Sequence, residues 1–113
     1  MMDTVHVNIG GKGRPVRFGN RAMSIFARET GASFGSVSQP IENWRVDHLF
    51  ALFWAGLKAG AQKEGAVGDA SVDDVADWCD DPAVIQDMFR AFQAAQPKPD
   101  GDDAGKEGNA TGR

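Results

Sequence analysis

The 113-residue sequence predicts an α+β fold that is mainly α: an N-terminal β-hairpin, a small four-helix domain and a disordered C-terminal tail. Apolar residues alternate near the N-terminus and then recur with helical spacing in four later segments. From Pro97 onward there is no aromatic residue and no Val, Ile, Leu or Met. A segment of this composition cannot bury enough apolar surface to offset its ordering entropy. We therefore expect one folded domain over residues 1–96 and a disordered tail over residues 97–113.

The hairpin is expected over about residues 4–18. Apolar and polar residues alternate in Val5–Ile9 and again in Arg14–Phe18, which is the pattern of strands buried on one face. Gly10–Gly13 between them is the predicted turn. A two-stranded hairpin is only marginally stable alone. Its apolar face must therefore lie on helices, or the hairpin must pair with strands of another subunit.

Four helices are expected, at about residues 20–30, 45–62, 71–80 and 82–96. Their starts are marked by residues that cap helices: Asn20, Ser71 with Asp74 in the capping-box position, and Asp81 ahead of Pro82. Gly31 is the expected stop of the first helix.

The helix over residues 45–62 has more apolar surface than one-sided packing requires. Its large apolar residues cover about 200° of the circumference, about twice the stripe of an ordinary surface helix. Ala51, Ala55 and Ala59 form a further row of small residues that lets another helix approach closely. Either this helix is the centre of the domain, packed against aromatic residues of the other elements, or part of it binds another chain. The candidate partner-binding residues are Trp44, Phe50, Ala51, Trp54, Ala55, Leu57 and Trp78.

The composition and the polar residues argue against catalysis and against several kinds of partner. The net charge of −4 and the lack of a Lys/Arg cluster disfavour nucleic-acid binding. No apolar run is long enough to span a bilayer, and no signal peptide is recognised, so we expect an intracellular protein with no membrane partner. A single cysteine, Cys79, excludes an intrachain disulfide, and we expect it to be a buried, inert thiol.

The aspartates of residues 73–81 could share a hard cation, but a solvated helix face with two caps explains them more simply. His6 and His48 lie on the polar sides of their elements and are expected to be exposed. The glycine-rich turn lacks the Gly-Lys-Ser/Thr ending of a phosphate-binding loop. We therefore expect no catalytic residue, no metal site and no cofactor.

The order of the motifs resembles the tail assembly chaperones of long-tailed bacteriophages and prophages. The segments that carry the resemblance are VNIGGKGRPVRFG, NRAMSIFARETG, LFALFWAGLKAGA and SVDDVADWCDD, followed by an amphipathic helix, within about residues 5–93. The resemblance implies a non-catalytic protein of the host cytoplasm that binds the helical tape-measure protein during tail assembly and is absent from the mature virion. It also allows the tail-tube protein as a further partner. Separately, the wide apolar arc of the helix over residues 45–62 and the lone hairpin predict a homo-oligomer. In many members of this family a ribosomal frameshift adds a second domain.

Two other classes of function remain open. One is a structural phage component, such as a head–tail connector or a minor tail protein. The other is a small helical protein-binding adaptor unrelated to phages.

Overall fold

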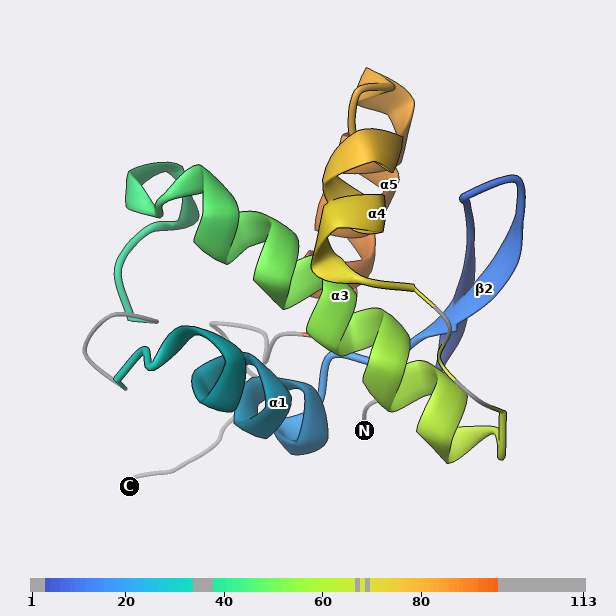
Figure 1. The fold of residues 1–113 in the computed structure, drawn as a ribbon, viewed down its shortest axis with the longest axis horizontal. Helices are drawn as coiled ribbons and strands as arrows, with labels where there is room; N and C mark the ends of the chain where they lie inside the picture. Colours follow the sequence, from blue (N-terminus) through green and yellow to red (C-terminus); the bar gives the residue numbers. More distant parts are fainter. Residues whose placement is uncertain (1–3, 34–37, 67, 69, 96–113) are drawn as a thin grey trace.

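The computed structural model describes residues 4–33, 38–66, 68 and 70–95 (Figure 1). The antiparallel strands β1 (Val5–Ile9) and β2 (Lys12–Val16) form a hairpin. The helical elements follow in this order: α1 (Asn20–Thr30), the 3₁₀ turn η1 (Ile41–Asn43), α3 (Val46–Lys63), α4 (Val72–Trp78) and α5 (Pro82–Ala95). The predicted α+β, mainly α class is therefore confirmed. The predicted disordered tail lies outside the described residues.

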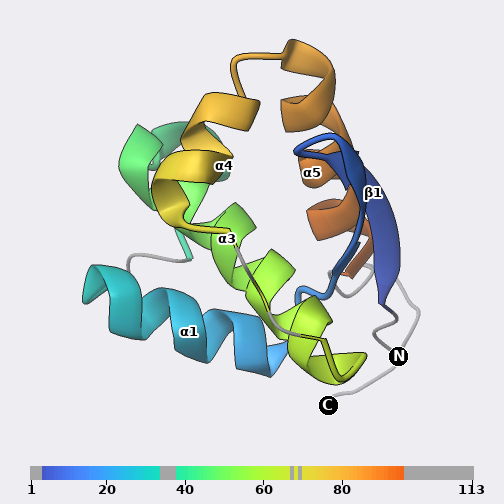
Figure 2. The same ribbon diagram turned by 45° about the vertical axis from the view of Figure 1, so that its right-hand side comes forward.

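Helix α3 is the central element of the fold. In Figures 1 and 2, α1 lies on one side of it, α4 and α5 on another, and the hairpin beside its C-terminal half. The rings of Phe53 and Phe89 meet edge to face at 5.5 Å and join α3 to α5. The largest fully buried side chains come from the hairpin and from all four α-helices: Phe26, Phe53, Ile9, Leu52, Met88, Val16 and Val75. The wide apolar arc of α3 is thus explained mainly by neighbours within the same chain.

The hairpin turn is shorter than the sequence pattern predicted. Gly10 and Gly11 have positive φ angles of 68° and 83°, and Ile9 pairs directly with Lys12 across this two-residue turn. Tight turns of this kind favour glycine, because both central residues take a conformation that side chains disfavour. Strand β2 therefore begins at Lys12, two residues earlier than expected.

The hairpin and α3 approach each other closely at two helix glycines. The Arg17 backbone N–H donates to the Gly56 carbonyl oxygen at 3.0 Å, and the Phe18 ring lies directly over Gly56. One turn later, the backbone of Pro15 lies against Gly60. A Cβ at either glycine would collide with these groups. The absence of side chains at both positions is therefore what lets the hairpin lie on α3.

Most helix ends agree with the capping residues read from the sequence. The Ser71 hydroxyl accepts from the Asp74 N–H and the Asp74 carboxylate from the Ser71 N–H, both at 3.0 Å, so the capping box is confirmed. Asp81 accepts from the Ala83 N–H ahead of α5. Gly31 ends α1 with a left-handed conformation. The prediction for the start of α1 was wrong. The N-cap of this helix is Gly19 rather than Asn20, and no side chain caps it.

We predict that Gly60→Ala destabilises the protein, although alanine is normally the better residue inside a helix by about 1 kcal/mol. The new methyl group would meet the Pro15 backbone, which cannot rotate away. Overpacking of this kind costs about 1–3 kcal/mol. Urea unfolding followed by tryptophan fluorescence measures the change.

Gly13→Ala is the control for this variant. Its Cβ would meet only the Asn8 side chain, at an ordinary contact distance of 3.6 Å, so we expect a much smaller change. A Gly60→Ala variant as stable as the parent protein would contradict the close approach of β2 to α3.

Candidate protein-binding surface

Two of the tryptophans singled out from the sequence bridge elements within the chain. Trp44 is half-buried and stacks on Phe26 with ring centroids 5.3 Å apart, while its Nε1–H donates to the Gln39 carbonyl oxygen at 3.0 Å. Trp54 is also half-buried, and its Nε1–H donates to the Ala70 carbonyl oxygen at 2.9 Å. Both indoles thus have internal hydrogen bonds. Their role in partner binding stays a prediction.

The third tryptophan, Trp78, lies under the hairpin turn. A Cβ at Gly10 would collide with its indole ring, so the turn packs directly on it. The guanidinium carbon of Arg14 lies 4.6 Å from the ring centroid, within the range of a cation–π contact. Arg14 also donates from Nε to the Ile9 carbonyl oxygen at 2.9 Å. Trp78 therefore joins α4 to the hairpin and keeps part of its surface exposed.

The row of small residues on α3 is covered by the chain itself. Ala51 and Ala55 are buried, and the Phe26 ring of α1 meets the nearby His48 ring edge-on at 6.0 Å. This contact places α1 on the side of α3 that carries the alanines. His48, expected to be exposed, is half-buried because of this packing. Leu57 is buried as well. These residues could contact a partner only if the packing opened, so their binding role stays a prediction.

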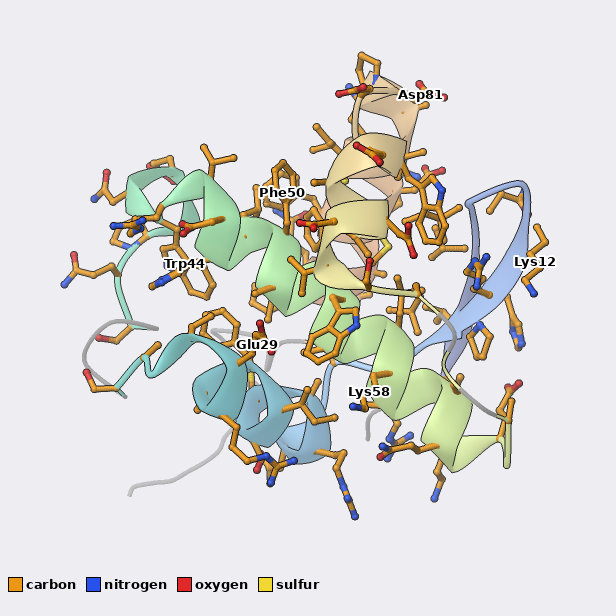
Figure 3. All side chains as sticks on the ribbon, in the orientation of Figure 1. Lys12, Glu29, Trp44, Phe50, Lys58 and Asp81 are labelled. Atoms are coloured by element: carbon orange, nitrogen blue, oxygen red, sulfur yellow. The ribbon has the colours of Figure 1, made fainter. Side chains whose placement is uncertain are left out.

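An apolar stripe of α3 continues from the core onto the surface, and we call its exposed end the open stripe. Phe53 and Leu57 are buried, whereas Phe50 and Leu49 are half-buried and Val46 is 66% exposed. The open stripe consists of Val46, Leu49 and Phe50, which share one helix face. In Figure 1 the first turns of α3 extend beyond α4 and α5, and Figure 3 shows Phe50 and Trp44 on opposite sides of the helix.

The end of α3 beside the open stripe carries an exposed ion pair. The Arg45 guanidinium donates to both carboxylate oxygens of Asp47 at 3.0 Å. This hydrogen bonding lowers the pKa of the Asp47 carboxyl and raises that of Arg45. The open stripe is therefore an apolar surface with a charged rim.

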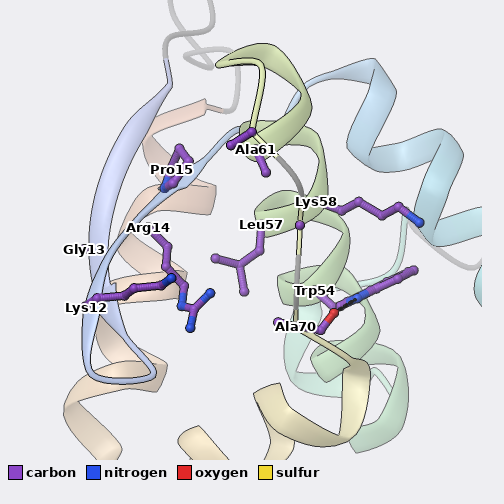
Figure 4. Close-up of a pocket in the computed structure, with 11 residues that line it drawn as sticks. Lys12, Gly13, Arg14, Pro15, Trp54, Leu57, Lys58, Ala61 and Ala70 are labelled. Carbon is purple, nitrogen blue, oxygen red and sulfur yellow. Dashed lines mark hydrogen bonds between the residues drawn. The ribbon is translucent and has the colours of Figure 1, made fainter.

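A cavity of about 210 Å³ lies between β2, the C-terminal half of α3 and the segment before α4 (Figure 4). Lys12 and Arg14 come from its hairpin wall, while Leu57 and Ala61 come from α3. The Lys58 and Trp54 side chains point away from the hairpin residues in Figure 4, and Lys58 Nζ lies 5.0 Å from the Trp54 ring centroid. The cavity is thus a seam between the hairpin, α3 and the segment before α4.

The acidic, histidine and cysteine side chains in the described part of the chain are the candidates for metal binding and catalysis. No group of three or more His, Cys, Asp or Glu side chains is placed there to hold a metal ion. His6 is exposed, with Nε2 3.3 Å from a Glu64 carboxylate oxygen. Cys79 is buried as expected. Burial, together with the neighbouring Asp80 carboxylate, raises the pKa of the Cys79 thiol to about 11. None of the helices in the described residues combines the length and apolarity that a bilayer-spanning segment needs.

We predict that Cys79 reacts with disulfide reagents roughly 100-fold more slowly in the folded protein at pH 8 than in urea. A pKa rise from 9.0 to about 11 lowers the thiolate fraction by about that factor. The unfolded chain loses its thiol proton at lower pH than the folded chain. The stability contributed by this group is therefore present below pH 9 and falls as the pH rises toward 11.

The Cys79→Ala variant is the control, because it should lack this component of the pH dependence of unfolding. Fast labelling of the native protein would show that the thiol is accessible and would overturn the burial of Cys79.

Comparisons with known proteins place this chain in no family. No protein-family model matches it, and neither curated protein sequences nor solved structures gave a match.

Proposed function

We propose that this chain is a tail assembly chaperone of a long-tailed bacteriophage or prophage that binds the helical tape-measure protein and catalyses no reaction. The order of its sequence motifs, within about residues 5–93, is one support for this proposal. The open stripe of α3 is the structural observation that carries it. We further propose that the protein acts in the host cytoplasm, is absent from the mature virion and has the tail-tube protein as a second partner.

The open stripe has the residue spacing of a surface that binds an amphipathic helix. Val46, Leu49 and Phe50 follow the i, i+3, i+4 spacing of a helix face, and the same stripe continues into the core at Phe53. An apolar helix of a partner could lie along the first turns of α3 and extend the existing packing outward. Long helical proteins with exposed apolar faces are the class of client that such a surface would shield.

The size of the open stripe suits reversible binding. Burial of apolar surface contributes about 25 cal/mol per Å², so a contact of a few hundred Å² supplies several kcal/mol before ordering costs. A chaperone must release its client when the tail tube assembles around it. A small apolar contact with a charged rim, formed by Arg45 and Asp47, meets that need better than a large one.

We predict that Val46→Asp and Val46→Lys each weaken binding to the tape-measure protein by about 10-fold, or about 1.4 kcal/mol. Val46 is mostly exposed, so neither charge should disturb the fold. Using both signs of charge separates loss of apolar contact from electrostatic effects. The experiment is co-expression of the full chain with the tape-measure protein encoded nearby, followed by co-purification and an affinity measurement.

Gln62→Asp and Gln62→Lys are the matched controls. Gln62 is exposed on the opposite side of the same helix and should tolerate both charges. Failure of the parent protein to bind the tape-measure protein would refute the proposal. Its presence in purified virions, detected by mass spectrometry, would instead favour a connector or minor tail protein.

A further inference from the structure

The outer edge of β1 has no strand beside it in the described residues. The sheet there contains only β1 and β2. The outer edge of β2 is occupied, because Arg17 donates to Gly56 of α3 and Pro15 lies against Gly60. Among the described residues, no other element forms a backbone hydrogen bond with the edge of β1, and Figure 2 shows β1 at the outside of the molecule. An edge strand of this kind is a template for pairing with another chain.

The register of the hairpin fixes which backbone groups face outward. A two-residue turn makes Ile9 and Lys12 a hydrogen-bonded pair, and hydrogen-bonded and non-hydrogen-bonded pairs alternate along the strands. His6 and Asn8 therefore fall in the non-hydrogen-bonded pairs, opposite Pro15 and Gly13. Their N–H and C=O groups point away from β2. Two donors and two acceptors thus line the free edge.

A groove of about 420 Å³ runs along this edge, between β1 and α5. Four consecutive residues of the chain, from Val5 to Asn8, line one side. Side chains alternate between faces, so a consecutive run can line a groove only along a strand edge. Ala91 and Ala94 line the other side together with Asp87 and Arg90. Because the alanines are small, another backbone can approach both the strand and the helix.

We propose that a second copy of this chain fills the groove, with the two β1 strands pairing antiparallel around a twofold axis. With the axis at Val7, His6 of each copy lies opposite Asn8 of the other. Both residues direct their backbone groups outward, so this register forms four hydrogen bonds and joins the two hairpins into one four-stranded sheet. The same surface serves both copies, as a twofold interface requires.

The charged residues of α5 are also placed to form contacts across the same twofold axis. Ile9 and Val84 line a common hollow, and β1 and α5 run in opposite directions in Figure 2. Moving two residues back along β1, from Ile9 to Val7, covers about 6.6 Å, which equals the rise of about four helix residues. Because Ile9 lies beside Val84, Val7 lies at about the level of Met88 on α5. A twofold axis there brings Asp87 of each copy near Arg90 of the other. Within one chain these two already form a 2.8 Å ion pair, so the interface is complementary in charge.

The test is the sedimentation of the full chain from low to high micromolar concentration. We expect a monomer–dimer equilibrium. Asn8→Pro removes an outward N–H without removing a hairpin hydrogen bond, and Ala94→Lys fills the groove. Each should weaken the dimer by at least about 10-fold. Asn8→Thr keeps the N–H, and Gln93→Lys lies outside the groove lining, so these two matched controls should dimerise like the parent protein.

Hydrogen exchange gives a residue-level readout that does not depend on the variants. The His6 and Asn8 amides should be protected at high protein concentration and exchange freely at low concentration, while the fold stays intact by circular dichroism. A parent chain that stays monomeric, or an Asn8→Pro variant that dimerises normally, would overturn the proposal. So would a chain that dimerises only after removal of residues 97–113, since the tail would then be the natural occupant. None of these outcomes bears on the Val46 test, so this proposal and the chaperone proposal fail separately.

Discussion

The close approach of the hairpin to α3 is the contact on which the rest of the fold depends. Gly56 and Gly60 remove two side chains from one face of the helix, and the Pro15–Phe18 segment occupies the space. The Phe18 ring over Gly56 also meets Phe92 edge-on at 5.4 Å, which ties α5 to the same point. Strand β2 is thereby held against α3 along one edge. The opposite edge of the sheet, along β1, is left without a neighbouring strand in the described residues.

This arrangement explains why α3 is both the core and the source of the candidate surface. The other elements pack around its middle and C-terminal turns, and most residues between Ala51 and Ala61 are buried. Its first turns extend past α5, so the same apolar stripe is covered at Phe53 and open at Val46. The candidate client surface is therefore a continuation of the core rather than a separate patch. A partner helix there would extend packing that the chain has already begun.

Local signals in the sequence predicted most of the helices and strands, whereas the contacts between these elements could not be predicted. Ser71, Asp81 and Gly31 act through groups a few residues away, so their roles follow from the sequence. The role of Gly60 could not be predicted, because its partner is a backbone segment far away in the chain. The alanine row indicated that a helix approaches α3 but could not tell α1 from a second subunit. The open stripe was only partly foreseen: Phe50 was singled out as a contact, but the exposure of Val46 depends on where α5 begins and ends.

The contact between β1 and α5 has a consequence for synthesis on the ribosome. The hairpin is made before the helices, and the helix that lies beside β1 begins only at Pro82. At about 5–20 residues per second, several seconds pass before α5 is available. Throughout that interval the side of β1 that contacts α5 is uncovered. The hairpin thus needs protection from aggregation during synthesis, in a protein that we propose protects another.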